Sequence, residues 1–183
     1  YATAFLQDDW SINKQFSVIA GLRCDYHEKY GTNLTPKASV MYKIFPFTVR
    51  FNYARGYRSP SIKELYMNWD HLGMFWIYGN SKLKPETNNY ISLSGEYVNS
   101  WININANVYS NWFRNKIEGM WSNDQTELHY INIGKSRLAG VETMCKIQIN
   151  RHINVHGAYN YLYTSKDADG VRLSSSSPHS GNI

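Results

Sequence analysis

Apolar and polar residues alternate along most of this chain, and this period of two limits the folds that it can adopt. From residue 16 to residue 26, every second residue is apolar or aromatic, whereas Arg23 and Asp25 fall between them. The same period returns at 49–54, 91–97, 102–108, 141–149 and 153–161. Successive side chains of a β-strand point to opposite faces of its sheet. The sequence therefore predicts an all-β fold, an antiparallel meander with one apolar and one polar face.

Short turns and long loops alternate between the predicted strands. The strands are expected at 2–12, 16–30, 36–44, 47–57, 88–98, 101–121, 128–149 and 153–165, with a ninth beginning near Gly181. The turns at 13–15, 45–46, 99–100 and 150–152 are short, whereas the loops at 31–35, 58–87, 123–127 and 166–180 are longer. Short connections at one end and long ones at the other are typical of a bacterial outer-membrane barrel.

Alternation alone fits either a soluble β-sandwich or a membrane barrel, and three features favour the barrel. Several strands exceed the usual length of soluble strands, and the polar face is crowded with Asn, Arg, Glu and Lys. Aromatic residues stand near the strand ends, where an interfacial girdle would lie: Trp10, Phe16, Tyr26, Tyr97, Trp112, Tyr161 and Tyr163. The expected convex, lipid-facing set is Val18, Leu22, Phe51, Leu93, Ile104, Ile147 and Val155. The expected concave set is Arg50, Asn52, Ser92, Glu96, Asn103, Asn105, Lys146 and Asn154.

Charge and motifs argue against several other classes of function. The net charge is +5, but Lys and Arg are dispersed, so a nucleic-acid partner is not expected. Asp8 and Asp9 are adjacent and would face opposite sides of a strand, so they cannot form a catalytic pair. Cys24 and Cys145 fall on distant strands without metal-ligand spacing. The sequence carries no enzyme signature, and we expect no enzyme activity.

Six segments resemble the barrel of TonB-dependent outer-membrane receptors, in the order in which that family has them. They are AFLQDDWSI at 4–12, LTPKASVMYKI at 34–44, YARGYRSPSIKELY at 53–66, GNSKLKPETNNYISLSGEY at 79–97, INIGKSRLAGVE at 131–142 and SPHSGNI at 177–183. The resemblance implies that residues 1–183 are part of a 22-stranded barrel whose lumen holds a plug. We expect residues 1–183 to include neither the plug domain nor the segment that contacts TonB.

The resemblance also implies a location, partners and a cargo. The expected location is the outer membrane of a Gram-negative bacterium, in contact with its lipid. The expected energy source is the TonB–ExbB–ExbD complex, acting through the plug. The expected cargo is a small-molecule metal chelate, first of all haem, with cobalamin, a siderophore, a glycan or a peptide as alternatives. No cofactor is expected, because haem would be cargo.

The long loop at 58–87 is the candidate cargo site. Its boxes at 57–60 and 80–83, together with His71, resemble those of haem receptors but depart from them at Ser59, Ser81 and Lys82. A haem cargo needs an axial donor, a flat apolar surface and cations for its propionates. The loop offers His71 as donor and cargo-metal ligand; Trp69, Phe75, Trp76 and Tyr78 as the surface; and Arg58 and Lys82 as cations.

Each of these residues also has a structural interpretation. The aromatic residues could form the loop's own small core, and His71 could be an ordinary loop histidine. Arg58, like Arg55, could attract a carboxylate-rich cargo. For Arg58 a salt bridge to Glu64 or Glu86 is the favoured alternative, because it would fix the base of the loop.

Overall fold

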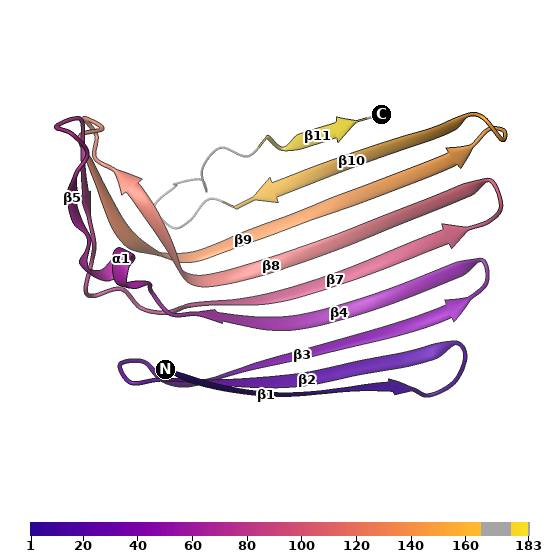
Figure 1. Ribbon diagram of the computed structural model, residues 1–183, viewed down its shortest axis with the longest axis horizontal. Helices are drawn as coiled ribbons and strands as arrows, with labels where there is room; N and C mark the ends of the chain where they lie inside the picture. Colours follow the sequence, from indigo (N-terminus) through magenta and orange to yellow (C-terminus); the bar gives the residue numbers. More distant parts are fainter. Residues whose placement is uncertain (166–176, 183) are drawn as a thin grey trace.

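The computed structural model describes residues 1–165 and 177–182, and its strands form one curved antiparallel sheet (Figure 1). The main strands are β1 (Ala2–Ser11), β2 (Phe16–His27), β3 (Gly31–Ile44), β4 (Phe47–Arg58), β7 (Glu86–Val98), β8 (Ile102–Trp121), β9 (Glu127–Gln148), β10 (Asn154–Thr164) and β11 (His179–Asn182). They lie side by side in that order. Because every described strand belongs to one sheet, the β-sandwich alternative is wrong. The predicted meander is confirmed, including a last strand that contains Gly181.

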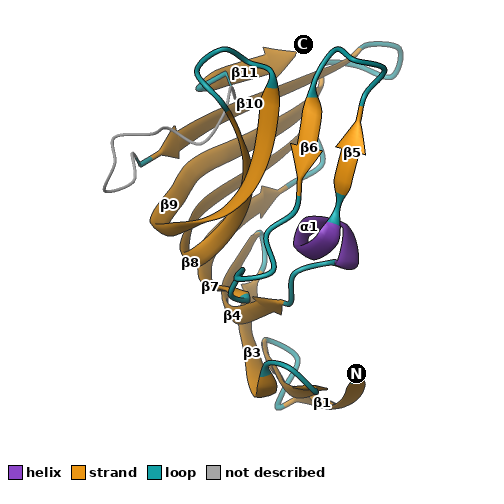
Figure 2. Cartoon of the chain, turned by 90° about the vertical axis from the view of Figure 1, so that its left-hand side faces the viewer, coloured by secondary structure: helices purple, strands orange, loops and turns teal. Residues whose placement is uncertain are grey.

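The 58–87 loop carries three elements that the alternation did not predict. They are α1 (Ile62–Tyr66), β5 (Asn68–Asp70) and β6 (Trp76–Tyr78). Figure 2 shows α1 and the β5–β6 hairpin on the concave side of the sheet. No helix in the described part of the chain has the length and hydropathy needed to span a membrane.

Register places the alternating residues on the two faces that were predicted. Val18, Val40 and Phe51 are paired across β2, β3 and β4. Phe51 in turn pairs with Leu93 of β7, and Leu93 with Val108 of β8. Paired residues of an antiparallel sheet point to the same face. The pairings of the remaining residues confirm both predicted sets, apolar on one face and polar on the other.

The polar set lies on the concave face. Arg58 has the same parity as Asn52 along β4, and it pairs with Glu64 of α1, which lies on the concave side (Figure 2). The apolar set therefore lies on the convex face, where Leu93 is 54% exposed. Large apolar residues pointing outward are expected where lipid surrounds the sheet.

Three of the four short turns share the same hydrogen-bonding pattern between an asparagine side chain and the backbone. Asn13, Asn99 and Asn150 each accept hydrogen bonds at Oδ1 from the backbone N–H groups two and three residues later, over 2.8–2.9 Å. An Asn side chain that bonds nearby backbone in this way stabilises a tight turn. All four predicted short turns are confirmed as hairpins.

Strand β3 begins at Gly31 rather than at residue 36, so the predicted loop at 31–35 is wrong. Pro36 suggested a break, because proline has no N–H for a ladder. The pairing of β3 with β4 begins only at Lys37 and Ala54, whereas its pairing with β2 continues to Gly31. Residues 31–36 are thus a strand edge, where proline is tolerated. Residues 166–176 of the predicted loop at 166–180 lie outside the described residues.

Candidate functional site

The base of the 58–87 loop is fixed by a capped helical turn and two ion pairs. The Ser61 hydroxyl accepts a hydrogen bond from the Glu64 backbone N–H, and the Glu64 carboxylate accepts one from the Ser61 backbone N–H, which is a capping box. The Arg58 guanidinium donates to Glu64 at 2.8 Å and to Glu86 at 3.2 Å. The favoured structural interpretation of Arg58 is therefore confirmed.

These contacts also set the charge state of Glu64. Partial burial by itself would raise the pKa of its carboxyl group. Hydrogen bonds from the Ser61 backbone and from Arg58 outweigh this effect and hold the pKa below its usual range. Glu64 is therefore ionised at neutral pH and available to pair with Arg58.

A small apolar cluster packs the loop onto the sheet. Leu65 of α1 and Leu83 lie against Ile117 of β8, with Tyr130 of β9 beside them. The Asn80 side chain donates to the Tyr130 carbonyl at 3.1 Å, and the Gly79 N–H donates to the Met67 carbonyl. Leu83 is only 2% exposed, so the loop is held to the wall by buried contacts.

The tip of the loop is a hairpin that extends the sheet. Strand β6 pairs with β5 on one side and, in parallel, with the first residues of β9 on the other. Trp69 pairs with Ile77, and Ile77 with Leu128, so their side chains share one face. Trp76 and Tyr78 point to the opposite face. The hairpin therefore presents two different surfaces.

One surface carries the His71 cluster, formed by Trp69, His71, Phe75 and Trp121. The imidazole ring lies 4.8 Å from the Trp69 ring and 4.7 Å from the Phe75 ring, and Phe75 lies 5.1 Å from Trp121. The His71 Nδ1 atom is buried and has no hydrogen-bond partner within the described residues. His71 is thus held between aromatic rings, as in the interpretation of these residues as the loop's own core.

The other surface carries the Trp76 stack, formed by Trp76, Tyr78 and His129. The Tyr78 ring is nearly parallel to both neighbours, at 11° to Trp76 and 17° to His129. The His129 Nε2 atom lies 2.7 Å from the Glu127 carboxylate. Trp76 remains 41% exposed, so this stack is open to a flat partner.

The structure places the seven predicted site residues in three parts of the loop. Trp69, His71 and Phe75 share one surface of the hairpin, and Trp76 and Tyr78 share the other. Arg58 is committed to the loop base, and Lys82 is exposed there, with its backbone N–H bonded to Asn80. His129 and Trp121 were missed, because they join the hairpin only through the β6–β9 pairing. Over the described residues, no group of three or more His, Cys, Asp or Glu could hold a metal ion.

Comparison with known families gives a match along the whole chain. The family model described as "TonB dependent receptor-like, beta-barrel" covers residues 1–183. The solved ferric enterobactin receptor mutant R480A from Pseudomonas aeruginosa, in complex with enterobactin, superposes with a TM-score of 0.80 at 20% identity. The superposition covers 97% of this chain and 29% of that one.

Curated relatives include three outer-membrane or transport proteins. The iron-regulated outer membrane virulence protein of Vibrio cholerae is 26% identical, over 88% of this chain and 27% of its own. The ferrienterobactin receptor of Escherichia coli K12 is 24% identical, over 93% of this chain and 25% of the receptor's length. The vitamin B12 transporter BtuB of Vibrio cholerae is 29% identical, over 77% of this chain and 21% of the transporter's length. The chain thus spans about a quarter of the length of these relatives.

Proposed function

The chain belongs to the family of TonB-dependent receptors of the Gram-negative outer membrane, and from this premise we propose that it is part of a receptor that imports a ferric siderophore. The observation that carries the proposal is the Trp76 stack. It is a set of nearly parallel rings, with Trp76 and His129 exposed, on an anchored loop that lies over the concave side of the sheet (Figure 2). Ordered loops on a rigid scaffold are the usual position for ligand capture.

A ferric siderophore with aryl groups suits this surface chemically. Its rings can stack on exposed aromatic side chains, a contact worth about 0.5–1.5 kcal/mol per pair. Its negative charge suits the lysines around the loop base: Lys29, Lys82 and Lys84 are exposed there, and Lys29 Nζ lies 3.0 Å from the Ser81 carbonyl oxygen. Relatives named for iron regulation and for ferrienterobactin support this class of cargo. The relative named for vitamin B12 makes cobalamin the alternative.

The test is ligand binding by the full-length receptor that carries this segment. A ferric catecholate siderophore, haem and cyanocobalamin are titrated separately against tryptophan fluorescence. The siderophore should bind, and Trp76→Ala should weaken its binding by about tenfold, which is ~1.4 kcal/mol. Trp101→Ala is the matched control, because Trp101 is exposed at the short-turn end. Binding of cyanocobalamin but of no ferric siderophore would overturn the cargo and leave the family membership intact.

His71 remains our predicted haem ligand, and the same receptor tests it. Two features of the cluster favour haem: Nδ1 of His71 has no hydrogen-bond partner among the described residues, and two aromatic rings flank the imidazole. If haem is the cargo, His71→Ala should lower haem affinity and shift the absorption spectrum of the bound haem. An unchanged affinity and spectrum would remove His71 as a ligand. His152→Ala is the control, because it removes an exposed imidazole at the short-turn end and leaves the 58–87 loop unchanged.

Import of the cargo should depend on TonB–ExbB–ExbD, acting through a plug domain of the full-length receptor. In a strain that lacks TonB, radiolabelled ferric siderophore should still bind to cells but should not enter the periplasm. Uptake that continues unchanged without TonB would contradict this part of the proposal. Surface binding in both strains is the control, because it needs only the loops.

A further inference from the structure

Three cations gather on the convex face near the long-loop end of the sheet. Arg114 of β8 pairs with Lys135 of β9, and Trp112 pairs with Arg137. These residues have the parity of Val108 and Val141, which belong to the apolar convex face. The three cations therefore point outward, away from the concave side that holds the loop.

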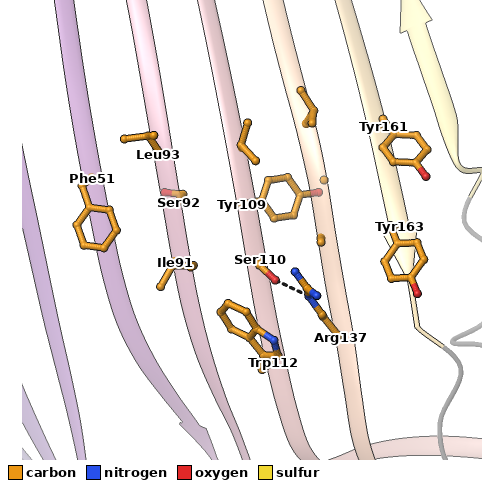
Figure 3. Close-up of a pocket in the computed structure, with 14 residues that line it drawn as sticks. Phe51, Ile91, Ser92, Leu93, Tyr109, Ser110, Trp112, Arg137, Tyr161 and Tyr163 are labelled. Carbon is orange, nitrogen blue, oxygen red and sulfur yellow. Dashed lines mark hydrogen bonds between the residues drawn. The ribbon is translucent and has the colours of Figure 1, made fainter.

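Arg137 is held in place by neutral neighbours. Its Nε donates to the Ser110 hydroxyl at 2.9 Å, and its guanidinium carbon lies 5.3 Å from the centre of the Trp112 ring (Figure 3). Within residues 1–165 and 177–182, no carboxylate forms a salt bridge with Arg114, Lys135 or Arg137. Three like charges side by side repel one another unless an anion joins them.

A shallow apolar groove of about 690 Å³ adjoins these cations on the same face. Arg137 lines this groove and also lines a neighbouring hollow together with Arg114 and Lys135. Its lining includes Phe51, Leu93, Val108, Trp112 and Tyr163; Figure 3 shows Trp112 and Tyr163 on either side of Arg137, and Phe51 and Leu93 farther along the groove. The site thus combines an apolar channel with a cationic rim.

The position along the strands matches the edge of the membrane. The apolar band of such barrels is about 25 Å tall, and a tilted strand advances about 2.5 Å along the membrane normal per residue. A strand therefore crosses the band in about ten residues. Trp112 lies about ten residues beyond the start of β8 at Ile102, so it marks the outer boundary. Arg114 and Lys135 lie just beyond it, at the level of the outer-leaflet headgroups.

We propose that this face binds a phosphorylated lipid of the outer leaflet, the lipid A portion of lipopolysaccharide. An acyl chain lies in the groove, and a phosphate contacts Arg137, Arg114 and Lys135. Guanidinium groups bind phosphate through paired, charge-assisted hydrogen bonds. Phosphate charge removes the repulsion among the cations, and the Trp112 and Tyr163 rings lie at the boundary between acyl chain and headgroup.

The test measures lipopolysaccharide retained by the purified full-length receptor. Wild type and the triple variant R114Q/K135Q/R137Q are washed in detergent and analysed by native mass spectrometry. The control K14Q/K146Q/R151Q removes the same charge from the short-turn end or the concave face. Wild type and control should retain lipopolysaccharide, and R114Q/K135Q/R137Q should retain about tenfold less, as expected for lost charge-assisted bonds.

Two further arms identify the source of the phosphate. Dephosphorylated lipid A should bind the wild type weakly, and inorganic phosphate at millimolar concentration should not displace lipopolysaccharide. Equal retention by R114Q/K135Q/R137Q and wild type, equal binding of dephosphorylated lipid, or displacement by free phosphate would each overturn the proposal. Siderophore binding by the same variants reports the cargo site, and heat-dependent gel mobility reports the fold.

Discussion

At the scale of single residues, Glu64 connects the helix cap to the ion pairs at the loop base. Glu64→Gln should remove the charge that strengthens the two hydrogen bonds from Arg58, and it should weaken the capping box. The expected loss of stability is within the ~0.5–2 kcal/mol known for lost caps. The loop should then open more often, which faster hydrogen exchange of the 61–67 backbone would report. Lys63→Gln is the control, since it changes an exposed side chain of the same helix, next to Glu64. Equal exchange in both variants would contradict the role given to Glu64.

The charge of Glu64 predicts an acid sensitivity with a definite sign. Its pKa in the folded loop lies below the usual value of 4.5. Its stabilising effect is therefore fully present above that usual value, and it is lost as the pH falls through the lower folded pKa. Proteolysis within 58–87 should become faster as the pH is lowered through this window. In Glu64→Gln the rate should not vary with pH in this way.

At the scale of secondary-structure elements, Gly79 sets how closely β6 approaches α1. A Cβ atom at this position would lie 2.6 Å from the backbone nitrogens of Tyr66 and Met67, which cannot move without distorting the helix end. Gly79→Ala should therefore displace the hairpin, at the ~1–3 kcal/mol typical of overpacking, and weaken siderophore binding. Gly95→Ala is the control, because a Cβ there has no heavy atom within 4 Å. Equal siderophore affinity in the two variants would be inconsistent with this packing.

Elements of the wall and of the loop differ in how far the sequence reveals them. The strands follow from alternation, because each has one face in lipid and one in the lumen. In the loop, the Ser61 and Glu64 spacing is a local sequence signal for α1, but α1 was not among the predictions. The β6–β9 pairing, which brings His129 to Tyr78, joins segments about fifty residues apart and leaves no periodic trace. Surfaces made by such pairings could not be predicted from the sequence.

At the scale of the whole molecule, the sheet carries two aromatic levels on its convex face. Phe47 and Tyr97 lie against each other near the short turns, with ring centres 5.2 Å apart. Trp112 and Tyr163 lie near the long loops, at the other end of the apolar face. Two such levels bound the hydrocarbon layer of a membrane barrel. They also bring the cations beyond Trp112 level with the lipid headgroups.

Leu93 lies midway between these levels, about five residues from the end of β7 at Val98, so it should face the bilayer midplane. Leu93→Arg in the full-length receptor, reconstituted in lipid vesicles, should lower the free energy of unfolding by roughly 2–4 kcal/mol, because the charge would enter hydrocarbon. Ser94→Arg puts the same side chain on the next residue, which faces the lumen, and should change it far less. Denaturant titration followed by tryptophan fluorescence measures both. If the two substitutions had small and equal effects, the convex face would not contact hydrocarbon. In a lipid bilayer, an arginine at residue 93 would enter hydrocarbon, whereas an arginine at residue 94 would enter the lumen, so their effects must differ.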